Sequence, residues 1–543
     1  FRMSTKARSL EPLLSNFADV LPEKRCRREG APLPSYLKGT LLRNGPGIFA
    51  HGEDKYEHWF DGDAYVQRYA FREGEMYYSA RALDTDSYRR NRKASRIVAG
   101  SFGTRTFPDP CKNIFQRFFS YFQSETPTDN ALVSFQTIGD QVYAQTEIPV
   151  LVPVAPDTLE AGTSIHSRDA LFSVHTSTAH CHTDSRGIVY NIGARYGKDS
   201  EYVFVKMTPK HRVKDGEVPF EAEIVAQVAA PKEGPAYFHS FGLTDNFFIL
   251  LESPLKLDIM TLAMRRLRGT TIRDAMKWVD GAVTDIVVVD RKTGQQHPIK
   301  YTSDACFTFH HANSFERDGH IVVDISRYEE FGIFDDLLIE NMKKPEFLKR
   351  RAGENAPFLH RYVIPLSVKQ GAKPGEDLLK GLSWAGKCEA MLQEDGSVYL
   401  RSEQLSEYNI EFPQYNYDLY NMKRYRYVYG TSVFSSKDQR NTVVKTDCDE
   451  RSTVAWAVDD EDQTAGEPIF VADPEGKRED DGLVVVPVMT TSPDSPPFVA
   501  VLNAHDMSER TRFVIPEDRI PFGFHCYYTN LHSKVPPKRQ LYF

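Results

Sequence analysis

The sequence predicts an all-β fold, and among all-β folds it favours a propeller. Short runs rich in β-branched and aromatic residues recur along the chain, as in "FFILLE" (247–252), "TDIVVVD" (284–290) and "LVVVPVM" (483–489). Turn-forming Gly, Asp and Asn separate these runs. Many short strands with regular turns indicate a sandwich, a barrel or a propeller, and of these a propeller stays one domain at this length. We therefore expect residues 1–543 to form a single propeller domain.

Helical patterns are few. The clearest are "CKNIFQRFFSYF" (111–122) and "DDLLIENMKKPEFLKR" (335–350), while "VKQGAKPGEDL" (368–378) has the composition of a surface loop. No motif repeats along the chain, so the pattern does not give the number of blades.

Composition excludes several classes of protein. The net charge is -8, with both signs interspersed and no basic block, which argues against a nucleic-acid partner. The chain shows no signal-peptide pattern and no run of about 18 apolar residues. The seven cysteines are odd in number and scattered, without a CxxC pair, which argues against a disulfide framework or a thiolate zinc site. Reduced thiols and a cytoplasmic location are expected.

Four histidine contexts stand apart among the 16 histidines. They are "TAHCHTD" around His180 and His182, "YFHSFGLTD" around His239, "FTFHHANSFERDGH" around His310 and His311, and "PFGFHCYY" around His525. Each places imidazole beside aromatic or small apolar residues, where a buried ring needs a polar partner or a metal. The wide separations match no local zinc motif, but they suit ligands delivered by different blades to one axis. A hydrogen-bonded core histidine is the ordinary alternative for each of them.

A collinear series of motifs carries a resemblance. It runs from "GTLLRNGPGIF" (39–49) and "HWFDGDA" (58–64) through "FPDPCKNIFQRFFSYF" (107–122) to "FHCYY" (524–528). The series resembles the carotenoid cleavage oxygenase family in its animal branch, and "NRKASRIV" and "NSFERDGHIVVDI" look most like its insect members. The resemblance implies a seven-bladed β-propeller, capped by helices and loops on the side that holds a substrate tunnel.

The resemblance also implies a metal site. An Fe2+ cofactor would be held on the propeller axis by His180, His239, His310 and His525, leaving His182 and His311 structural. Three carboxylates would orient ligands: Glu147 for His239, Glu411 for His310 and Glu467 for His525. Their ordinary alternative is a surface position. Thr146 would lie near the open iron position and shape oxygen access.

The implied reaction is cleavage of a C40 carotenoid by O2 at its central 15,15' double bond. The products would be retinals, with trans-to-cis isomerisation of one half (an 11-cis retinoid) for visual chromophore synthesis. Candidate substrates are β-carotene, zeaxanthin and lutein. Two alternatives stay open: a retinyl-ester isomerohydrolase on the same scaffold, and a non-catalytic lipid-binding propeller.

Two segments have the pattern of helices that lie on a membrane surface. The first is 111–122, and its candidate membrane-binding residues are Cys111, Ile114, Phe115, Phe118, Phe119 and Phe122, with Cys111 also a candidate palmitoylation site. The second is "LDIMTLAMRRLR" (257–268), where apolar bulk adjoins arginines. The alternative for both is a helix packed into the core. We expect peripheral membrane association.

Overall fold

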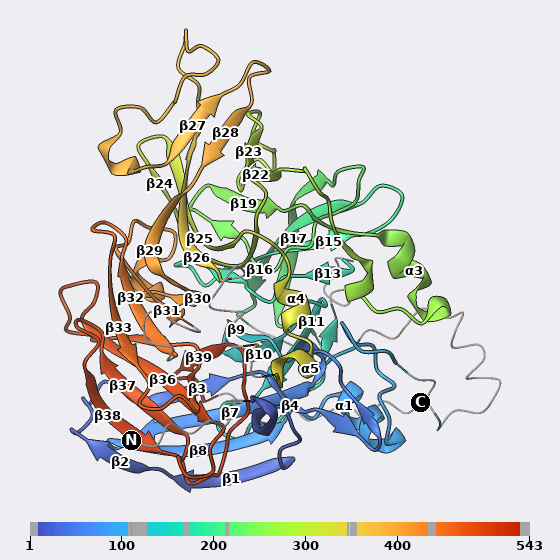
Figure 1. The fold of residues 1–543 in the computed structure, drawn as a ribbon, viewed down its shortest axis with the longest axis vertical. Coiled ribbons are helices and arrows are strands. Elements are labelled where there is room, and N and C mark those ends of the chain that lie inside the picture. Colours follow the sequence, from blue (N-terminus) through green and yellow to red (C-terminus); the bar gives the residue numbers. More distant parts are fainter. Residues whose placement is uncertain are drawn as a thin grey trace.

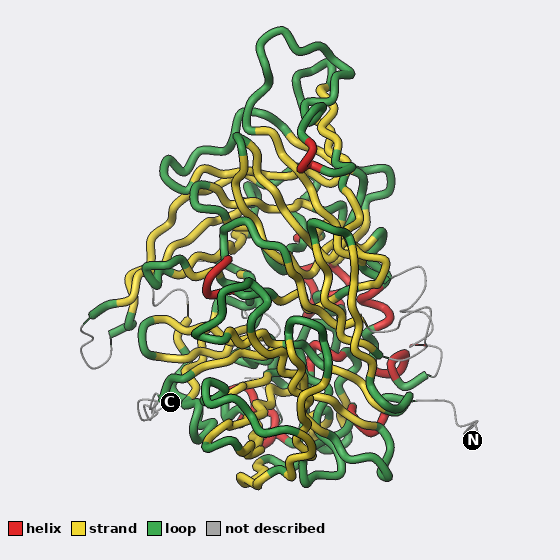
Figure 2. Tube along the Cα trace, turned by 90° about the vertical axis from the view of Figure 1, so that its left-hand side faces the viewer, coloured by secondary structure: helices red, strands yellow, loops and turns green. Residues whose placement is uncertain are grey.

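A computed structural model describes residues 9–106, 110, 128–166, 174–211, 217–344, 347, 356–432 and 441–532. Within these residues, strands form seven sheets of four to six strands each. The sheets follow one another around the molecule as the blades of a propeller. In Figure 1 the colour passes around the body from blue at the bottom, through green at the upper right, to red beside the blue. Figure 2 shows that strands and loops make up nearly all of it. The predicted seven-bladed, mostly β architecture is therefore confirmed.

The first four sheets contain the following strands. Sheet 1 contains β1 (Val20–Arg25), β3 (Gly39–Arg43), β4 (Pro46–Ile48), β7 (Asp63–Arg72), β8 (Glu75–Ala82) and β39 (Cys526–Thr529). Sheet 2 contains β9 (Ser134–Ile138), β10 (Gln141–Gln145), β11 (Val150–Val154) and β12 (Ile165–His166). Sheet 3 contains β13 (Thr176–Ser177), β14 (His182–Thr183), β15 (Val189–Arg195), β16 (Glu201–Pro209) and β17 (Phe220–Ala229). Sheet 4 contains β18 (Gly242–Leu243), β19 (Phe247–Glu252), β22 (Thr284–Asp290), β23 (Tyr301–Ser303), β27 (Glu389–Leu392) and β28 (Val398–Arg401).

Three further sheets complete the ring. Sheet 5 contains β24 (Phe307–Arg317), β25 (His320–Tyr328), β26 (Phe358–Pro365) and β29 (Glu403–Asn409). Sheet 6 contains β30 (Glu411–Gln414), β31 (Tyr427–Ser432), β32 (Thr442–Asp447) and β33 (Ser452–Ala457). Sheet 7 contains β2 (Arg27–Gly30), β34 (Gln463–Ala465), β35 (Ile469–Ala472), β36 (Gly482–Thr490), β37 (Phe498–Asn503) and β38 (Glu509–Val514). Two short ribbons pair β5 (Ala50–His51) with β6 (Asp54–Lys55) and β20 (Leu255–Leu257) with β21 (Met276–Trp278).

Both ends of the described chain close the ring. Strand β39 pairs with β3, where Arg43 lies opposite Cys526, and so the C-terminal strand completes sheet 1. Strand β2 pairs with β38, where Arg27 lies opposite Val514, and so an N-terminal strand completes sheet 7. Because each closing strand comes from the other end of the chain, sheets 1 and 7 hold each other in place.

How deeply a strand is buried depends on where it lies in its sheet. Strand β36 is buried along nearly its whole length because neighbouring sheets cover both of its faces, which explains the continuous apolar run "LVVVPVM". Strand β33, at the end of the strand order of sheet 6, has only one buried residue among its six. The side chains between the sheets thus form the core.

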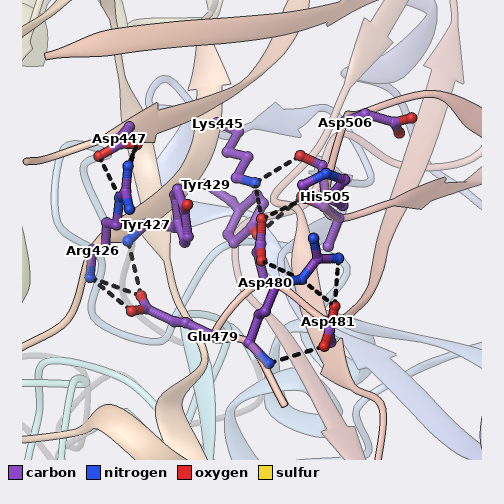
Figure 3. A network of polar contacts seen from close by, with 12 residues as sticks. Arg426, Tyr427, Tyr429, Lys445, Asp447, Glu479, Asp480, Asp481, His505 and Asp506 are labelled. Atoms are coloured by element: carbon purple, nitrogen blue, oxygen red, sulfur yellow. Dashed lines mark hydrogen bonds and ion pairs between the residues drawn. The ribbon is translucent and has the colours of Figure 1, made fainter. Parts of the chain in front are cut away.

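A polar network links sheet 6 to sheet 7 (Figure 3). The buried Lys445 ammonium on β32 lies 2.6 Å from Asp480 Oδ2 and donates to the carbonyl of His505 at 2.8 Å. The neighbouring Glu479 carboxylate accepts the backbone N–H groups of Arg426 and Tyr427 at 2.8 Å. Both acidic residues lie in the turn between β35 and β36, so this turn is fastened to the adjacent sheet.

The described helices are short, and they lie in segments that connect the strands. They are α1 (Asp86–Ala94), α3 (Ile259–Arg268), α4 (Ile333–Asp336), α5 (Ile339–Met342) and α7 (Tyr417–Tyr420), with 3-10 turns η1 (Glu11–Leu13), η2 (Trp59–Asp61), η4 (Arg273–Ala275) and η5 (Ser383–Ala385). Figure 1 shows α1 and α3 at the right of the body, with α4 and α5 nearer its centre. None of the described helices is long and apolar enough to cross a membrane.

The prediction of one helix over 335–350 is wrong in part. The described residues there form two short helices, α4 and α5, instead of one. Between them the Leu337 carbonyl accepts the Trp59 N–H at 3.0 Å, and the Ile339 N–H donates to the Glu57 carbonyl at 2.9 Å. These bonds to a distant segment replace the intrahelical bonds, so tertiary pairing overrides helix propensity. The segment 368–378 is a loop, as expected.

Candidate metal centre

Four histidines from four different sheets meet at one point. His310 lies within β24, whereas His180, His239 and His525 lie in the segments just before β14, β18 and β39. These strands stand at the inner ends of sheets 3, 4, 5 and 1. Each ring offers one nitrogen to the cluster, and these four nitrogens lie within 4.8 Å of one another. The sequence-predicted set is therefore brought together, although 215 residues separate His310 from His525.

The rings face one another through their Nε2 atoms. His180 Nε2 lies 2.9 Å from His239 Nε2, and His310 Nε2 lies 3.2 Å from His525 Nε2. Two nitrogens that bind one ion at right angles would be about 3.0 Å apart at a metal–nitrogen distance of about 2.1 Å. The distances of 2.9 and 3.2 Å are close to this value.

Three carboxylates engage the opposite nitrogens, and those of Glu411 and Glu467 are buried. His239 Nδ1 donates to Glu147 Oε1 at 2.5 Å, His310 Nδ1 donates to Glu411 Oε2 at 2.5 Å, and His525 Nδ1 donates to Glu467 Oε1 at 3.0 Å. These are the pairings expected from the sequence. A carboxylate at Nδ1 holds the proton there and leaves the Nε2 lone pair facing the cluster.

The three carboxylates come from the three sheets that supply no histidine. Glu147 follows β10 of sheet 2, Glu411 begins β30 of sheet 6, and Glu467 precedes β35 of sheet 7. Each of the seven sheets thus contributes one residue, either a histidine or the carboxylate that orients one.

Further donors fix the carboxylates, and the sequence did not reveal them. Tyr237 Oη donates to Glu147 at 2.6 Å, Tyr328 Oη donates to Glu411 at 2.6 Å, and Gln414 Nε2 donates to Glu467 at 2.8 Å. The sequence held a clue to two of these three donors. Tyr237 stands two residues before His239, and Gln414 stands three residues after Glu411, so each shares a segment with a predicted site residue.

The electrostatics of the centre favour neutral rings. Burial lowers the pKa of His310 to about 4, and burial together with the three neighbouring rings lowers the pKa of His180 well below its usual value. Burial would raise the pKa of Glu411, but His310, Tyr328 and the Phe412 amide together hold the pKa below its usual value. A neutral imidazole with a free Nε2 lone pair is the form that binds a divalent metal.

The two neighbouring histidines stay outside the cluster. His182 Nε2 donates to the Phe241 carbonyl at 3.0 Å, and His311 Nδ1 lies 2.8 Å from Ser240 Oγ. Burial lowers the pKa of His182 to about 4 and that of His311 to about 3. Both side chains are used in hydrogen bonds away from the four-histidine cluster.

A cavity of about 530 Å³ opens onto the centre. It is lined by His239, His310 and His525, by Thr146 beside Glu147, and by an apolar and aromatic wall that includes Trp59, Phe60, Phe102, Phe309, Leu337 and Phe412. Thr146 therefore lines the cavity that opens onto the cluster. Phe309 packs on His239 at 5.0 Å between ring centroids, and Phe412 packs on His525 at 5.2 Å.

Comparison with known proteins identifies the family. The family model described as retinal pigment epithelial membrane protein matches residues 17–530. The chain belongs to this family of carotenoid-cleaving oxygenases. It is 35% identical over 494 residues to β,β-carotene 15,15'-dioxygenase of Mus musculus, covering 90% of this chain and 86% of the relative. It is 33% identical over 527 residues to the mitochondrial carotenoid-cleaving dioxygenase of Pongo abelii, covering 95% of this chain and 93% of the relative.

Solved structures share the fold of this chain. A cobalt-substituted apocarotenoid oxygenase from Synechocystis superposes with a TM-score of 0.73 at 19% identity, covering 97% of this chain and 100% of the other. A chimera of apocarotenoid oxygenase and RPE65 superposes with a TM-score of 0.73 at 20% identity, covering 96% of this chain and 99% of the other. The predicted family and fold are both confirmed.

The chemistry of the donor set fits a metal of the first transition series. The four ligand atoms are imidazole nitrogens, and three carboxylates accept hydrogen bonds from the opposite ring nitrogens, as partners of metal-binding histidines commonly do. His180 differs from the others because, among the described residues, no carboxylate bonds its ring. The cluster thus has the donors for one ion, and carboxylates orient three of the four rings that would hold it.

The candidate membrane segment 111–122 lies outside the described residues, and with it Cys111, Ile114, Phe115, Phe118, Phe119 and Phe122. The second candidate is described as α3, a helix that Asp258 caps by accepting the Thr261 N–H at 3.0 Å. Met260 and Leu267 on α3 are 69% and 53% exposed, whereas Leu262 and Arg265 line the cavity. The six described cysteines are free thiols, as expected.

Proposed function

We propose that this protein is an iron(II)-dependent dioxygenase that cleaves a C40 carotenoid with O2 at the central 15,15' double bond, giving retinal products. The observation that carries the proposal is the convergence of four histidines, three of them oriented by carboxylates, on an aromatic cavity. The names of the relatives point to the same reaction, because the Mus musculus and Homo sapiens proteins are called β,β-carotene 15,15'-dioxygenases.

The proposed ligands of the iron are His180, His239, His310 and His525. Iron(II) bound by neutral imidazoles supplies the redox chemistry that O2 needs to react with an alkene. The protein residues position the reactants. The carboxylates of Glu147, Glu411 and Glu467 fix the direction of three rings, and the aromatic wall excludes water from the polyene.

The resemblance to insect members adds a finer proposal. One half of the cleaved substrate would be isomerised from trans to cis, giving an 11-cis retinoid for visual chromophore synthesis. A substrate that extends along the cavity places its two halves against different walls, which is the asymmetry that isomerisation of one half requires.

Carotenoids dissolve in lipid, so we propose that the enzyme collects its substrate as a cytoplasmic protein that binds membranes peripherally. Helix α3 supports this proposal because it presents Met260 and Leu267 to the outside and Leu262 to the cavity. The segment 111–122 would be the second contact. One domain, residues 1–543, would carry both the reaction and the docking.

The test incubates the purified, iron-loaded protein under 18O2 with β-carotene and, in a separate sample, with retinyl ester, followed by mass spectrometry of the products. Retinal that carries 18O is expected. Unlabelled retinol released from retinyl ester, with no cleavage of β-carotene, would show an isomerohydrolase. Binding of carotenoid without any product would show a lipid-binding propeller.

A further inference from the structure

His180 is held differently from the other three histidines of the cluster. Carboxylates accept the Nδ1–H of His239, His310 and His525. Among the described residues no carboxylate bonds the ring of His180, although its Nε2 lies 2.9 Å from His239 Nε2. Only χ1 and χ2 separate a histidine ring from its Cα atom, so a fixed main chain can also place the ring. The main chain of residues 177–180 is fixed in this way.

Thr178 and Asn191 lock the peptide that leads to His180. Thr178 Oγ1 accepts the His180 N–H at 3.2 Å and donates its own proton to Asn191 Oδ1 at 2.5 Å. Asn191 Nδ2 donates to the Thr178 carbonyl at 2.9 Å, and the Thr178 N–H donates to the Ile192 carbonyl at 2.9 Å. Both side chains are buried. The hydroxyl, the N–H and the carbonyl of Thr178 are therefore all paired inside the protein.

Sheet 2 holds the same segment as well. Ser134 Oγ on β9 donates to the Ala179 carbonyl, and the Ser177 N–H donates to the Glu147 carbonyl at 3.0 Å. Glu147 is also the residue whose carboxylate orients His239. Each residue from 177 to 180 thus has a main-chain group in a hydrogen bond, and two different sheets supply the partners.

Neighbouring rings restrict the side chain of His180 further. Its ring centroid lies 4.5 Å from that of His525 and 4.9 Å from that of His310, and both pairs are T-shaped. Thr178, Asn191 and Ser134 are not among the residues that line the cavity. They do not touch a molecule bound there, so they can act on it only through the histidine that they hold.

From these contacts we infer that Thr178, Asn191 and Ser134 are positioning residues for His180. They do through the main chain what a carboxylate does for each of the other three rings. The inference rests on the proposed function in that it takes the four histidines as metal ligands. An imidazole without a carboxylate is a weaker electron donor, so the affinity that His180 adds depends on how exactly its ring is placed.

The test measures binding of cobalt(II) alone to the metal-free protein, by competition with a chelator. Thr178→Val removes the hydroxyl at nearly constant shape, whereas Thr178→Ser keeps it. Ser134→Ala removes the bond to Ala179 independently, and it decides the question if Thr178→Val does not fold. Thr284→Val is the control, because the buried Thr284 hydroxyl accepts the Cys306 N–H at 3.0 Å and bonds no residue of the cluster.

The Kd for cobalt(II) should rise about 10-fold in Thr178→Val and in Ser134→Ala, the lower end of the range for residues that orient ligands. Thr178→Ser and Thr284→Val should stay close to the wild-type Kd. The visible absorption spectrum of bound cobalt(II) reports how its ligands are arranged. It should change in Thr178→Val and return to the wild-type form in Thr178→Ser. In the iron-loaded enzyme kcat should fall while KM stays, because these side chains do not line the cavity.

The outcomes separate the positioning role from the proposed reaction. A wild-type Kd and spectrum in both Thr178→Val and Ser134→Ala would overturn the positioning role and leave the proposed function standing. An equal rise in Kd in Thr284→Val would also overturn it, because loss of any buried hydroxyl would then have the same effect. A raised Kd in Thr178→Val that recovers in Thr178→Ser, with no cleavage of carotenoid by the wild type, would support the positioning role and overturn the proposed function.

Discussion

Glu467 and His525 join the two ends of the propeller. His525 Nδ1 donates to Glu467 Oε1 at 3.0 Å, and the Cys526 N–H donates to the other oxygen of the same carboxylate. Glu467 belongs to sheet 7, whereas His525 leads into β39 of sheet 1. The contact therefore crosses the seam where the ring closes, so closure of the fold and completion of the four-histidine cluster depend on the same carboxylate.

Replacing each orienting carboxylate should weaken the metal site. Glu147→Gln, Glu411→Gln and Glu467→Gln keep the size of the side chain and remove its charge, so the Nδ1 proton loses its ionic acceptor. We expect a loss of about 10–100-fold in turnover or in iron retention for each variant. Steady-state cleavage and metal analysis on the same preparations measure both.

Glu252→Gln is the matched control for this series. Glu252 is also a buried carboxylate, but it bonds Lys256 and Tyr202 and touches no histidine of the cluster. It should retain iron at the wild-type level. A variant of Glu147, Glu411 or Glu467 with wild-type turnover and iron content would remove that residue from the site.

Acid should destabilise the fold through buried neutral histidines. Burial lowers the pKa of His58 to about 3 and that of His360 to about 3. The unfolded chain takes up these protons near pH 6.5, whereas the folded chain does not, so the free energy of unfolding falls as the pH drops from about 6.5 to about 3. Each such histidine costs about 1.4 kcal/mol per pH unit in this window.

The measurement is the thermal unfolding midpoint at pH 7.5 and pH 5.5. The drop between the two pH values should be smaller in His360→Gln than in wild type, whatever the absolute midpoint of the variant. His211→Gln changes an exposed histidine and should keep the wild-type drop. An equal drop in His360→Gln would show that this ring does not remain neutral in the folded state.

If α3 binds membranes, removing its exposed apolar side chains should move the protein from the membrane fraction to the soluble fraction. Met260→Ser with Leu267→Ser removes the large exposed apolar side chains of this helix, and we expect less protein to sediment with liposomes. Phe115→Ser, Phe118→Ser and Phe119→Ser, combined in one variant, should have the same effect if 111–122 is the second contact. Activity should fall on carotenoid in liposomes and fall much less on detergent-dispersed carotenoid.

Leu419→Ser is the control for docking, because Leu419 is 58% exposed on α7 and belongs to neither candidate segment. It should sediment as the wild type does. If the α3 variant still sediments fully, that helix does not dock. If the 111–122 variant fails to fold, its rings belong to the core.

Strands were the most predictable part of the fold. The runs "FFILLE" and "TDIVVVD" coincide with β19 and β22 because buried strands between sheets require continuous apolar residues. The helix at 335–350 was less predictable. Its pattern is helical, but a hydrogen bond donated by the Trp59 N–H and one accepted by the Glu57 carbonyl divide it. No local pattern reveals partners so distant in the sequence.

The metal centre also contains residues that could be predicted from the sequence and residues that could not. Histidine contexts and family motifs located the four rings and three carboxylates because each stands in a distinctive local sequence. Tyr328 escaped notice because β25 reads as an ordinary strand, and the bond from its hydroxyl to Glu411 exists only once sheets 5 and 6 are adjacent.

The most direct test of the metal centre is the iron content per chain of purified wild type and six single variants, measured by elemental analysis. His180→Ala, His239→Ala, His310→Ala and His525→Ala should each lose iron and cleavage activity, because one of four fixed ligands is gone. His182→Ala and His311→Ala should keep about one iron per folded chain. Loss of iron from His311→Ala with retention in His310→Ala, or full iron content in any of the four ligand variants, would contradict the account.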